Sequence, residues 1–358
     1  DTVLTKTRLF TNNMKTEIID KHCIFILGGC SFTTPHTDNK TWGSILYDMF
    51  HRKNNLSIDD GTGVLKEYKT TSVHNNAGVS VGNQYILKDT MGLVDSYKHE
   101  NIDYTDFGED PPKGLDKMAI IQISSLNRTD AYDHDGGQWH HAPKVTRMYD
   151  VATKLWKPIA ELGQTALRFY QKITIKQEEE AELKRGNEAV DLNGMPAYDY
   201  WDAYYEYIYS EERHFSELLT NIITAQTYFN KHNVPHRFFL GWDVLTVSES
   251  YINGETYTMK NNMWDTDSLY ENKHLELLIE KYPHLRCLWD TIDWSKFWFF
   301  ENEHVKYGGL NEWLKYNLDS KDWYVAENDS HPSTKAQNKF FKEVIVKQIT
   351  SMLREITT

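Results

Sequence analysis

Short apolar runs, separated by stretches in which apolar residues recur at helical spacing, dominate the pattern of this 358-residue chain. An apolar run of about four to eight residues that ends at turn residues is typical of a strand buried on both faces. Five such runs predict the strands of a mainly parallel sheet: residues 22–28, 71–75, 117–124, 236–241 and 286–289.

Helices are predicted between these strands, at residues 42–50, 83–97, 198–230 and 334–356. Ser333 or Thr334 is the expected N-cap of the last helix. Since strands alternate with helices, we expect an α/β fold with three layers, α/β/α, around a doubly wound, mainly parallel, five-stranded sheet. Such sheets bind ligands at the carboxyl ends of their strands.

About 110 residues separate the third predicted strand from the fourth, which is far more than one crossover helix requires. This stretch contains a polar loop at 132–141, a charged helix at 177–185 and an aromatic run at 198–209. We predict a single domain over residues 1–358, with residues 128–230 as an insertion or lid and residues 1–20 as an N-terminal extension. The aromatic run suits a helix–helix contact or the interface of a homo-oligomer.

The composition narrows the classes of protein to consider. A formal charge of −13 argues against a nucleic-acid partner, because phosphate recognition needs clustered Lys and Arg. No apolar stretch approaches the roughly 18 residues of a transmembrane helix, and the first residues lack the apolar core of a signal peptide. We therefore expect no membrane association and a cytoplasmic location, with another export route or a place in a virion left open.

The cysteines exclude two further kinds of structure. Cys23, Cys30 and Cys287 are too few and too scattered for a disulfide framework or a zinc site.

Candidate catalytic residues lie near the two ends of the chain, in Gly29-Cys30-Ser31-Phe32-Thr33 and Asp329-Ser330-His331-Pro332. A serine hydroxyl becomes a useful nucleophile when a histidine removes its proton and a carboxylate orients that histidine. The first segment follows a predicted strand and the second precedes the last predicted helix. Two further polar segments, residues 75–80 and 124–128, follow the second and third predicted strands.

These four segments, in this order, resemble the four sequence blocks of the SGNH/GDSL hydrolase family. The resemblance implies a flavodoxin-like sheet, a nucleophile at Ser31 and a general base at His331. It also implies an oxyanion hole formed by the N–H groups of Ser31 and Gly78 with the side chain of Asn127. Asp329 is the candidate for the acid that orients His331, and neither a metal nor a cofactor is expected.

Two positions depart from the common pattern of that family. The third block reads Ser125-Leu126-Asn127-Arg128 where Gly-x-Asn-Asp is usual, and Asp329 stands two residues before the histidine where three are usual. A Ser31–His331 dyad with a backbone carbonyl as orienter is the alternative. An α/β-hydrolase is not favoured, because Thr33 occupies the last position of its Gly-x-Ser-x-Gly motif.

Simpler roles compete with the catalytic ones. Ser31 can merely cap the following helix, and Asn76 with Gly78 can merely form a turn. The segment 133–141 contains metal-ligating residue types, but without fixed spacing it suits a polar loop near the substrate better. The aromatic run 289–300 suits buried core residues better than a sugar-stacking face.

The sequence thus predicts a serine esterase that cleaves an O-acyl ester, such as an acetyl ester, on a glycan or another small molecule. Candidate substrate-binding residues beside the site are Asn76, Arg128, His134 and Trp139. An O-acyltransferase and a non-catalytic carbohydrate-binding or structural protein with the same fold are the alternatives.

Overall fold

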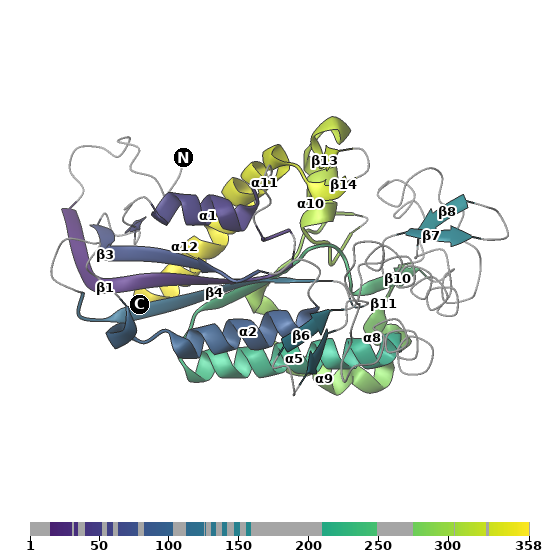
Figure 1. Cartoon of the computed structure of the whole chain (residues 1–358), viewed down its shortest axis with the longest axis horizontal. Helices are drawn as coiled ribbons and strands as arrows, with labels where there is room; N and C mark the ends of the chain where they lie inside the picture. Colours follow the sequence, from purple (N-terminus) through teal and green to yellow (C-terminus); the bar gives the residue numbers. More distant parts are fainter. Residues whose placement is uncertain are drawn as a thin grey trace, which may run out of the picture.

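Six strands form the central sheet of the computed structural model (Figure 1): β1 (Lys15–Gly28), β2 (Ser57–Asp59), β3 (Val64–Asn75), β4 (Leu115–Ile123), β9 (His236–Leu240) and β12 (Phe297–Trp298). Their order across the sheet is β12-β9-β4-β1-β3-β2. Five of them run parallel, and β2 pairs with β3 in the antiparallel sense at one edge. The chain therefore has an α/β fold with a mainly parallel sheet.

The structure describes residues 15–30, 32–34, 40–51, 56–59, 64–77, 82–102, 112–124, 126, 130–133, 138–141, 147–150, 155–158, 210–248, 275–303, 305–326 and 329–357. For residues 15, 51, 57–59, 64–65, 130–158, 247–248, 275, 326, 329–330 and 357 within these ranges it describes the backbone path alone.

The strand order places a topological switch point beside β1. After β1, the chain adds β3 on one side of it and then adds β4, β9 and β12 in succession on the other side. The connections that leave the carboxyl ends of β1 and β4 therefore diverge. Open α/β sheets bind ligands in the crevice that forms at such a point.

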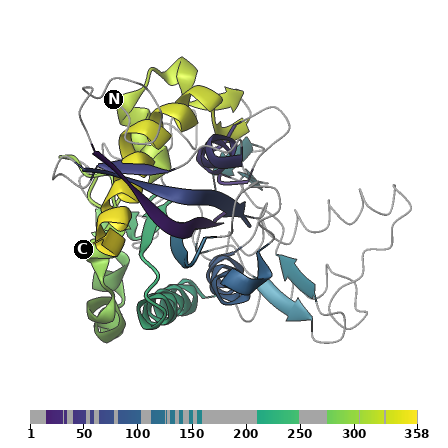
Figure 2. The same ribbon diagram turned by 90° about the vertical axis from the view of Figure 1, so that its left-hand side faces the viewer.

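Helices cover both faces of the sheet, as Figures 1 and 2 show. On one face α2 (Asn83–Ser96) and α5 (Glu211–Lys231) pack against each other. On the other lie α1 (Trp42–His51), α11 (Thr334–Phe340) and α12 (Val346–Thr357). Because both faces are covered, residues 23–27 of β1 are all buried, which explains their unbroken apolar run.

Four of the five predicted parallel strands are confirmed, as β1, β3, β4 and β9. The fifth is wrong, because residues 286–289 belong to helix α9 (Arg286–Thr291) and the fifth parallel strand is β12. Leu285, Trp289 and Ile292 are buried and recur at helical spacing. A four-residue apolar run does not by itself distinguish a strand from a buried helical turn.

The predicted helices at 42–50 and 83–97 correspond to α1 and α2. The last predicted helix corresponds to α11, a π-helical stretch Phe341–Ile345 and α12, and the Ser333 hydroxyl caps it by accepting from the Ala336 N–H at 3.1 Å. Of the helix expected at 198–230, the structure describes α5, from Glu211 onward. The charged segment 177–185 and the aromatic run 198–209 lie outside the described residues.

Two β-hairpins occupy the described part of residues 130–158. β5 (Asp130–Asp133) pairs with β6 (Gln138–His141), and β7 (Arg147–Asp150) pairs with β8 (Leu155–Pro158). The polar loop expected at 132–141 is therefore in large part a hairpin, and its polar sequence gave no strand signal because a two-stranded ribbon has no apolar face of its own to bury. The C-terminal part of region 128–230 is helix α5, which packs against α2 on one face of the sheet. That part is therefore not an addition to the sheet domain.

The boundaries of the expected N-terminal extension also change. β1 begins at Lys15, so the strand includes the last residues of the segment 1–20. In the part of the chain that the structure describes, no helix is both long and apolar enough to cross a bilayer.

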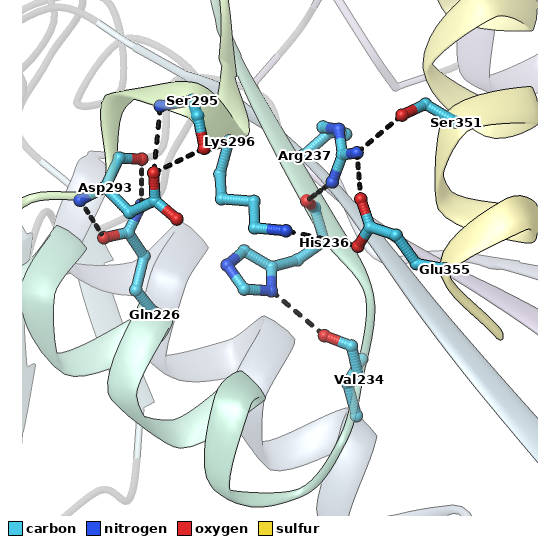
Figure 3. A network of polar contacts seen from close by, with 9 residues as sticks. All are labelled: Gln226, Val234, His236, Arg237, Asp293, Ser295, Lys296, Ser351 and Glu355. Carbon is cyan, nitrogen blue, oxygen red and sulfur yellow. Dashed lines mark hydrogen bonds and ion pairs between the residues drawn. The ribbon is translucent and has the colours of Figure 1, made fainter. Parts of the chain in front are cut away.

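A polar network fastens the amino end of β9 to its neighbours (Figure 3). Arg237 is 6% exposed, and its guanidinium pairs with Glu355 of α12 and donates to Ser351 Oγ at 2.8 Å. Lys296 Nζ lies 3.2 Å from the other carboxylate oxygen of Glu355. A buried charge needs such partners. Because the network lies at the edge opposite the carboxyl ends of the strands, we assign it a structural role.

His22 of β1 is buried between two hydroxyl groups of β3. Its Nδ1 lies 2.5 Å from Thr70 Oγ1 and its Nε2 lies 2.7 Å from Ser72 Oγ. Burial, with a smaller effect of His99, lowers the pKa of His22 to about 4. The imidazole is therefore neutral in the folded chain at neutral pH.

We expect His22 to make stability fall on acidification. Below pH 6.5 the unfolded chain binds a proton at His22, whereas the folded chain does so only near pH 4. Stability that is present above pH 6.5 is therefore lost as the pH falls, by about 2 kcal/mol between pH 8 and pH 5. Urea unfolding of His22→Gln should show a pH dependence weaker by this amount, whereas His232→Gln, at an exposed histidine, should match the wild type. An equal pH dependence in all three proteins would contradict the prediction.

Candidate active site

The carboxyl ends of the parallel strands lie level with one another at one edge of the sheet. Leu27 near the end of β1 pairs with Asn75 of β3, and Ile123 of β4 pairs with Leu240 of β9. The segments that follow β1, β3 and β4 therefore leave the sheet near each other. They are the first three of the four sequence blocks that predict a catalytic site.

The chain turns sharply after β1. The Cys30 carbonyl accepts hydrogen bonds from the N–H groups of Thr33 at 2.8 Å and Thr34 at 3.1 Å. Cys30 and Phe32 are both buried. Ser31 lies outside the described residues, and the backbone on either side of it is thus held against the core.

Thr33 connects this turn to three other elements. Its hydroxyl donates to Gln122 Oε1 of β4 at 2.6 Å and accepts from Trp42 Nε1 of α1 at 3.1 Å. Its carbonyl accepts from Thr41 Oγ1 at 2.7 Å and from Asn75 Nδ2 of β3 at 3.0 Å. All these groups lie at or near the carboxyl edge, so Thr33 fixes the turn relative to β3, β4 and α1.

Gly29 permits the close approach of this turn to β4. A Cβ atom at position 29 would lie 2.4 Å from Thr33 Oγ1 and 3.1 Å from Gln122 Cβ. Any side chain there would displace the Thr33 hydroxyl from its partners.

Asparagine side chains organise the ends of β3 and β4. Asn75 Oδ1 accepts from the Ala77 N–H at 3.2 Å, and the Asn76 N–H donates to Leu27 O at 3.0 Å. At the start of α2, the amide of Asn83 accepts from the Ser124 N–H at 2.7 Å and donates to Ser124 O at 3.1 Å. These contacts fix the chain directly before Gly78 and shortly before Asn127.

His331 lies against the turn that follows β1. It belongs to β14 (Asp329–Pro332), which pairs with β13 (Tyr324–Ala326) and leads into α11. The rings of Phe32 and His331 meet edge to face, with their centroids 5.6 Å apart and an interplanar angle of 68°. The residue after Ser31 therefore touches the predicted general base, although 299 positions separate the two rings in the sequence.

Two carboxylates, the buried Glu312 and the half-buried Asp243, support the other side of this contact. The Trp242 ring packs edge to face on Phe32, with centroids 5.3 Å apart. The next residue, Asp243, donates its N–H to Glu312 Oε2 at 2.9 Å, and the same oxygen accepts from the Gly309 N–H at 2.7 Å, at the start of α10 (Leu310–Asn317). Glu312 thus joins the segment after β9 to α10.

Glu312 influences the ionisation of Asp243. Burial, together with the nearby charge of Glu312, raises the pKa of Asp243 to about 7. Burial also raises the pKa of Glu312. Like charges in a site with little water disfavour double ionisation, so the pair holds a proton at mildly acidic pH.

Of the predicted site residues, the structure describes the side chains of Asn76, which is half-buried, and His331. The others are Ser31, Gly78, Asn127, Arg128 and His134, which lie outside the described residues, and Trp139 and Asp329, for which β6 and β14 give the backbone alone. Their roles therefore stay predictions. The structure brings together Phe32, the residue after Ser31, and the ring of His331.

Metal binding has no support from the described residues. Among them, no group of three or more His, Cys, Asp and Glu side chains could hold an ion. The side chains of the segment 133–141 are not among those described.

Several residues that organise the site do not stand out as functional in the sequence. Gln122 is a polar residue inside the apolar run of β4, and Asn83 is a buried amide at the first position of a helix. A polar residue on an otherwise apolar face is the signal that could have identified Gln122. The partners of both residues become evident only from the fold.

Comparison with known proteins finds no matching family model, no matching curated protein and no matching solved structure. The support for a function therefore comes from the sequence blocks and from the contacts at the carboxyl edge.

We expect Thr33→Val to lower the free energy of unfolding by about 1–3 kcal/mol, because buried polar groups of Gln122 and Trp42 lose the hydroxyl that they share. Thr34→Val is the matched control. Its hydroxyl is half-buried and, among the described residues, makes one contact, with Cys30 O at 3.3 Å, so about 1 kcal/mol or less is expected. Urea unfolding measures both losses. Equal losses would show that the Thr33 hydroxyl contributes no more to stability than the Thr34 hydroxyl.

Asp243 should make stability fall as the pH rises. Its folded pKa of about 7 lies above the ordinary value of 3.8, so only the folded chain holds this proton between those values. That stabilisation is lost as the pH rises through 7, by about 1.4 kcal/mol between pH 6 and pH 8. Thermal unfolding of Asp243→Asn should lack this component, whereas the exposed control Asp319→Asn should retain it. If Asp243→Asn kept the pH dependence of the wild type, the loss of stability near pH 7 would not come from the Asp243 carboxyl.

Proposed function

We propose that this chain is a serine hydrolase of the SGNH type, which cleaves an ester through an acyl-enzyme on Ser31. The observation that carries the proposal is the ring contact between Phe32 and His331. Because Phe32 directly follows Ser31 in the chain, this contact supports the pairing of Ser31 with His331 that the proposal requires. A serine and a histidine are the two residues that such chemistry needs first.

The level ends of β1, β3 and β4 support the same interpretation. Three of the four blocks have described residues, among them Phe32, Ala77 and Ser124. These residues belong to segments that leave one edge of the sheet together. Helices on both faces and the switch point beside β1 are compatible with the doubly wound sheet of that family.

In the proposed reaction, Ser31 Oγ attacks the ester carbonyl while His331 removes its proton. The N–H groups of Ser31 and Gly78 and the Asn127 side chain stabilise the oxyanion, and Asp329 orients His331. His331 then protonates the leaving alcohol, which departs as the acyl-enzyme forms. Water, activated by His331, releases the acid and restores Ser31.

The proposed substrate is an O-acyl ester, such as an acetyl ester, on a carbohydrate. The high aromatic content, with 22 tyrosines and 11 tryptophans, favours a carbohydrate, and the charge of −13 disfavours anionic polymers. Asn76, Arg128, His134 and Trp139 are the proposed substrate-binding residues, and the predicted insertion 128–230, apart from its helix α5, is the proposed lid.

Ser31→Ala is expected to lower kcat/KM for p-nitrophenyl acetate by about 10⁴-fold or more, because it removes the nucleophile. A fluorophosphonate probe should label the wild-type chain and leave Ser31→Ala unlabelled. Ser96→Ala is the control, since Ser96 is exposed at the end of α2 and donates to Leu93 O at 2.9 Å.

The outcomes separate the proposal from its competitors. Transfer of the acyl group to an added sugar faster than to water would identify an acyltransferase. No turnover and no labelling of the wild-type chain would overturn the catalytic proposal and favour a carbohydrate-binding or structural protein.

A further inference from the structure

Gln337 is a fully buried amide on α11, six residues after His331. Its Nε2 donates to Phe32 O at 3.2 Å, and its Oε1 accepts from the Trp42 N–H at 3.1 Å. One side chain thus bonds both to the residue that follows Ser31 and to the first residue of α1. Nearby, the Lys40 N–H donates to Thr334 Oγ1 at 3.2 Å. Helix α11 therefore bonds to the chain just before α1 and to the first residue of α1.

This contact closes a short loop of interactions around the catalytic pair. The Phe32 ring packs on His331, and the Phe32 carbonyl is bonded to the helix that His331 leads into. Phe32 is therefore held from both its side chain and its backbone, by the histidine and by the helix after it. Movement of the turn away from His331 would break the bond to Gln337.

A purely structural role for Gln337 is the competing explanation. The Trp42 N–H is one of the donors at the start of α1 that have no partner within the helix, so the Gln337 oxygen also completes a helix end. The bond to Phe32 O has no such function, since it reaches the turn that carries Ser31.

We propose that Gln337 is a positioning residue, which sets the separation between Ser31 and His331 by fastening the turn after β1 to α11. The inference rests on the proposed function. Displacement of a catalytic pair by about 1 Å is enough to slow a reaction about 100-fold, so loss of this bond should act on kcat and leave KM nearly unchanged.

Gln226 provides a matched control in the same molecule. It is also a buried amide on a helix, and it bridges the backbone of one residue by donating to Asp293 O at 2.9 Å and accepting from the Asp293 N–H at 3.0 Å (Figure 3). It lies at the amino edge of the sheet, away from the proposed site. The two amides differ mainly in the segments that they hold.

The experiment compares Gln337→Met with Gln226→Met in the full chain. Both should lower Tm to a similar extent, because each removes two buried hydrogen bonds. Only Gln337→Met should lower kcat for p-nitrophenyl acetate, by about 10- to 100-fold with KM within about twofold of the wild type. Equal kcat values in the two variants would overturn the proposal.

A second readout does not depend on turnover. In chains labelled with ¹³C-histidine, the imidazole signal of His331, assigned with His331→Asn, should shift in Gln337→Met and stay in place in Gln226→Met. If the wild type proves inactive, the proposed function fails, yet this shift still decides whether Gln337 positions His331.

If Gln337→Met does not fold, Gln337→Glu and Gln226→Glu replace the pair, because a glutamate oxygen can still accept from the backbone N–H.

Discussion

The hydrogen bonds of Thr33 are the constraint on which the rest of the site depends. Its hydroxyl and carbonyl together bond to Gln122, Trp42, Thr41 and Asn75, which belong to or adjoin three different elements. A turn that is bonded on all sides cannot shift without breaking buried hydrogen bonds. This rigidity suits a nucleophile, because the reacting atoms of an enzyme must be held in place before the substrate arrives.

The site forms from both ends of the chain, and this has a consequence for folding. Phe32 meets His331 and Gln337 only when the end of β1, β14 and α11 have come together. Contacts of such long sequence separation form late, because the entropy of closing the intervening chain must be overcome first. The arrangement of the candidate site is therefore a property of the complete fold and has no local precursor.

Much of this fold could be predicted from the pattern of buried apolar residues. The features that were missed depend on which distant residues meet in the folded chain. β1, β4 and β9 are apolar on both faces, so their sequences identify them. β12 has two residues inside an aromatic run and offers no periodicity, whereas the spacing of Trp289 and Ile292 belongs to a helix. At the site, residue types and order predict Ser31 and His331. The pairs Gln122–Thr33 and Asp243–Glu312 join positions far apart in sequence, and nothing local indicates which distant residue each will meet.

The π-helical stretch Phe341–Ile345 gives the C-terminal helix a change of phase. In a regular helix each residue advances by about 100°, so the buried positions of α11 and those of α12 would face different directions. A π turn accommodates one surplus residue and rotates the rest of the helix by about that angle. The π turn therefore brings Ile349 and Leu353 of α12 onto the same buried face as Gln337 of α11. A single helix can in this way border the turn after β1 at one end and still bury its other end against the core.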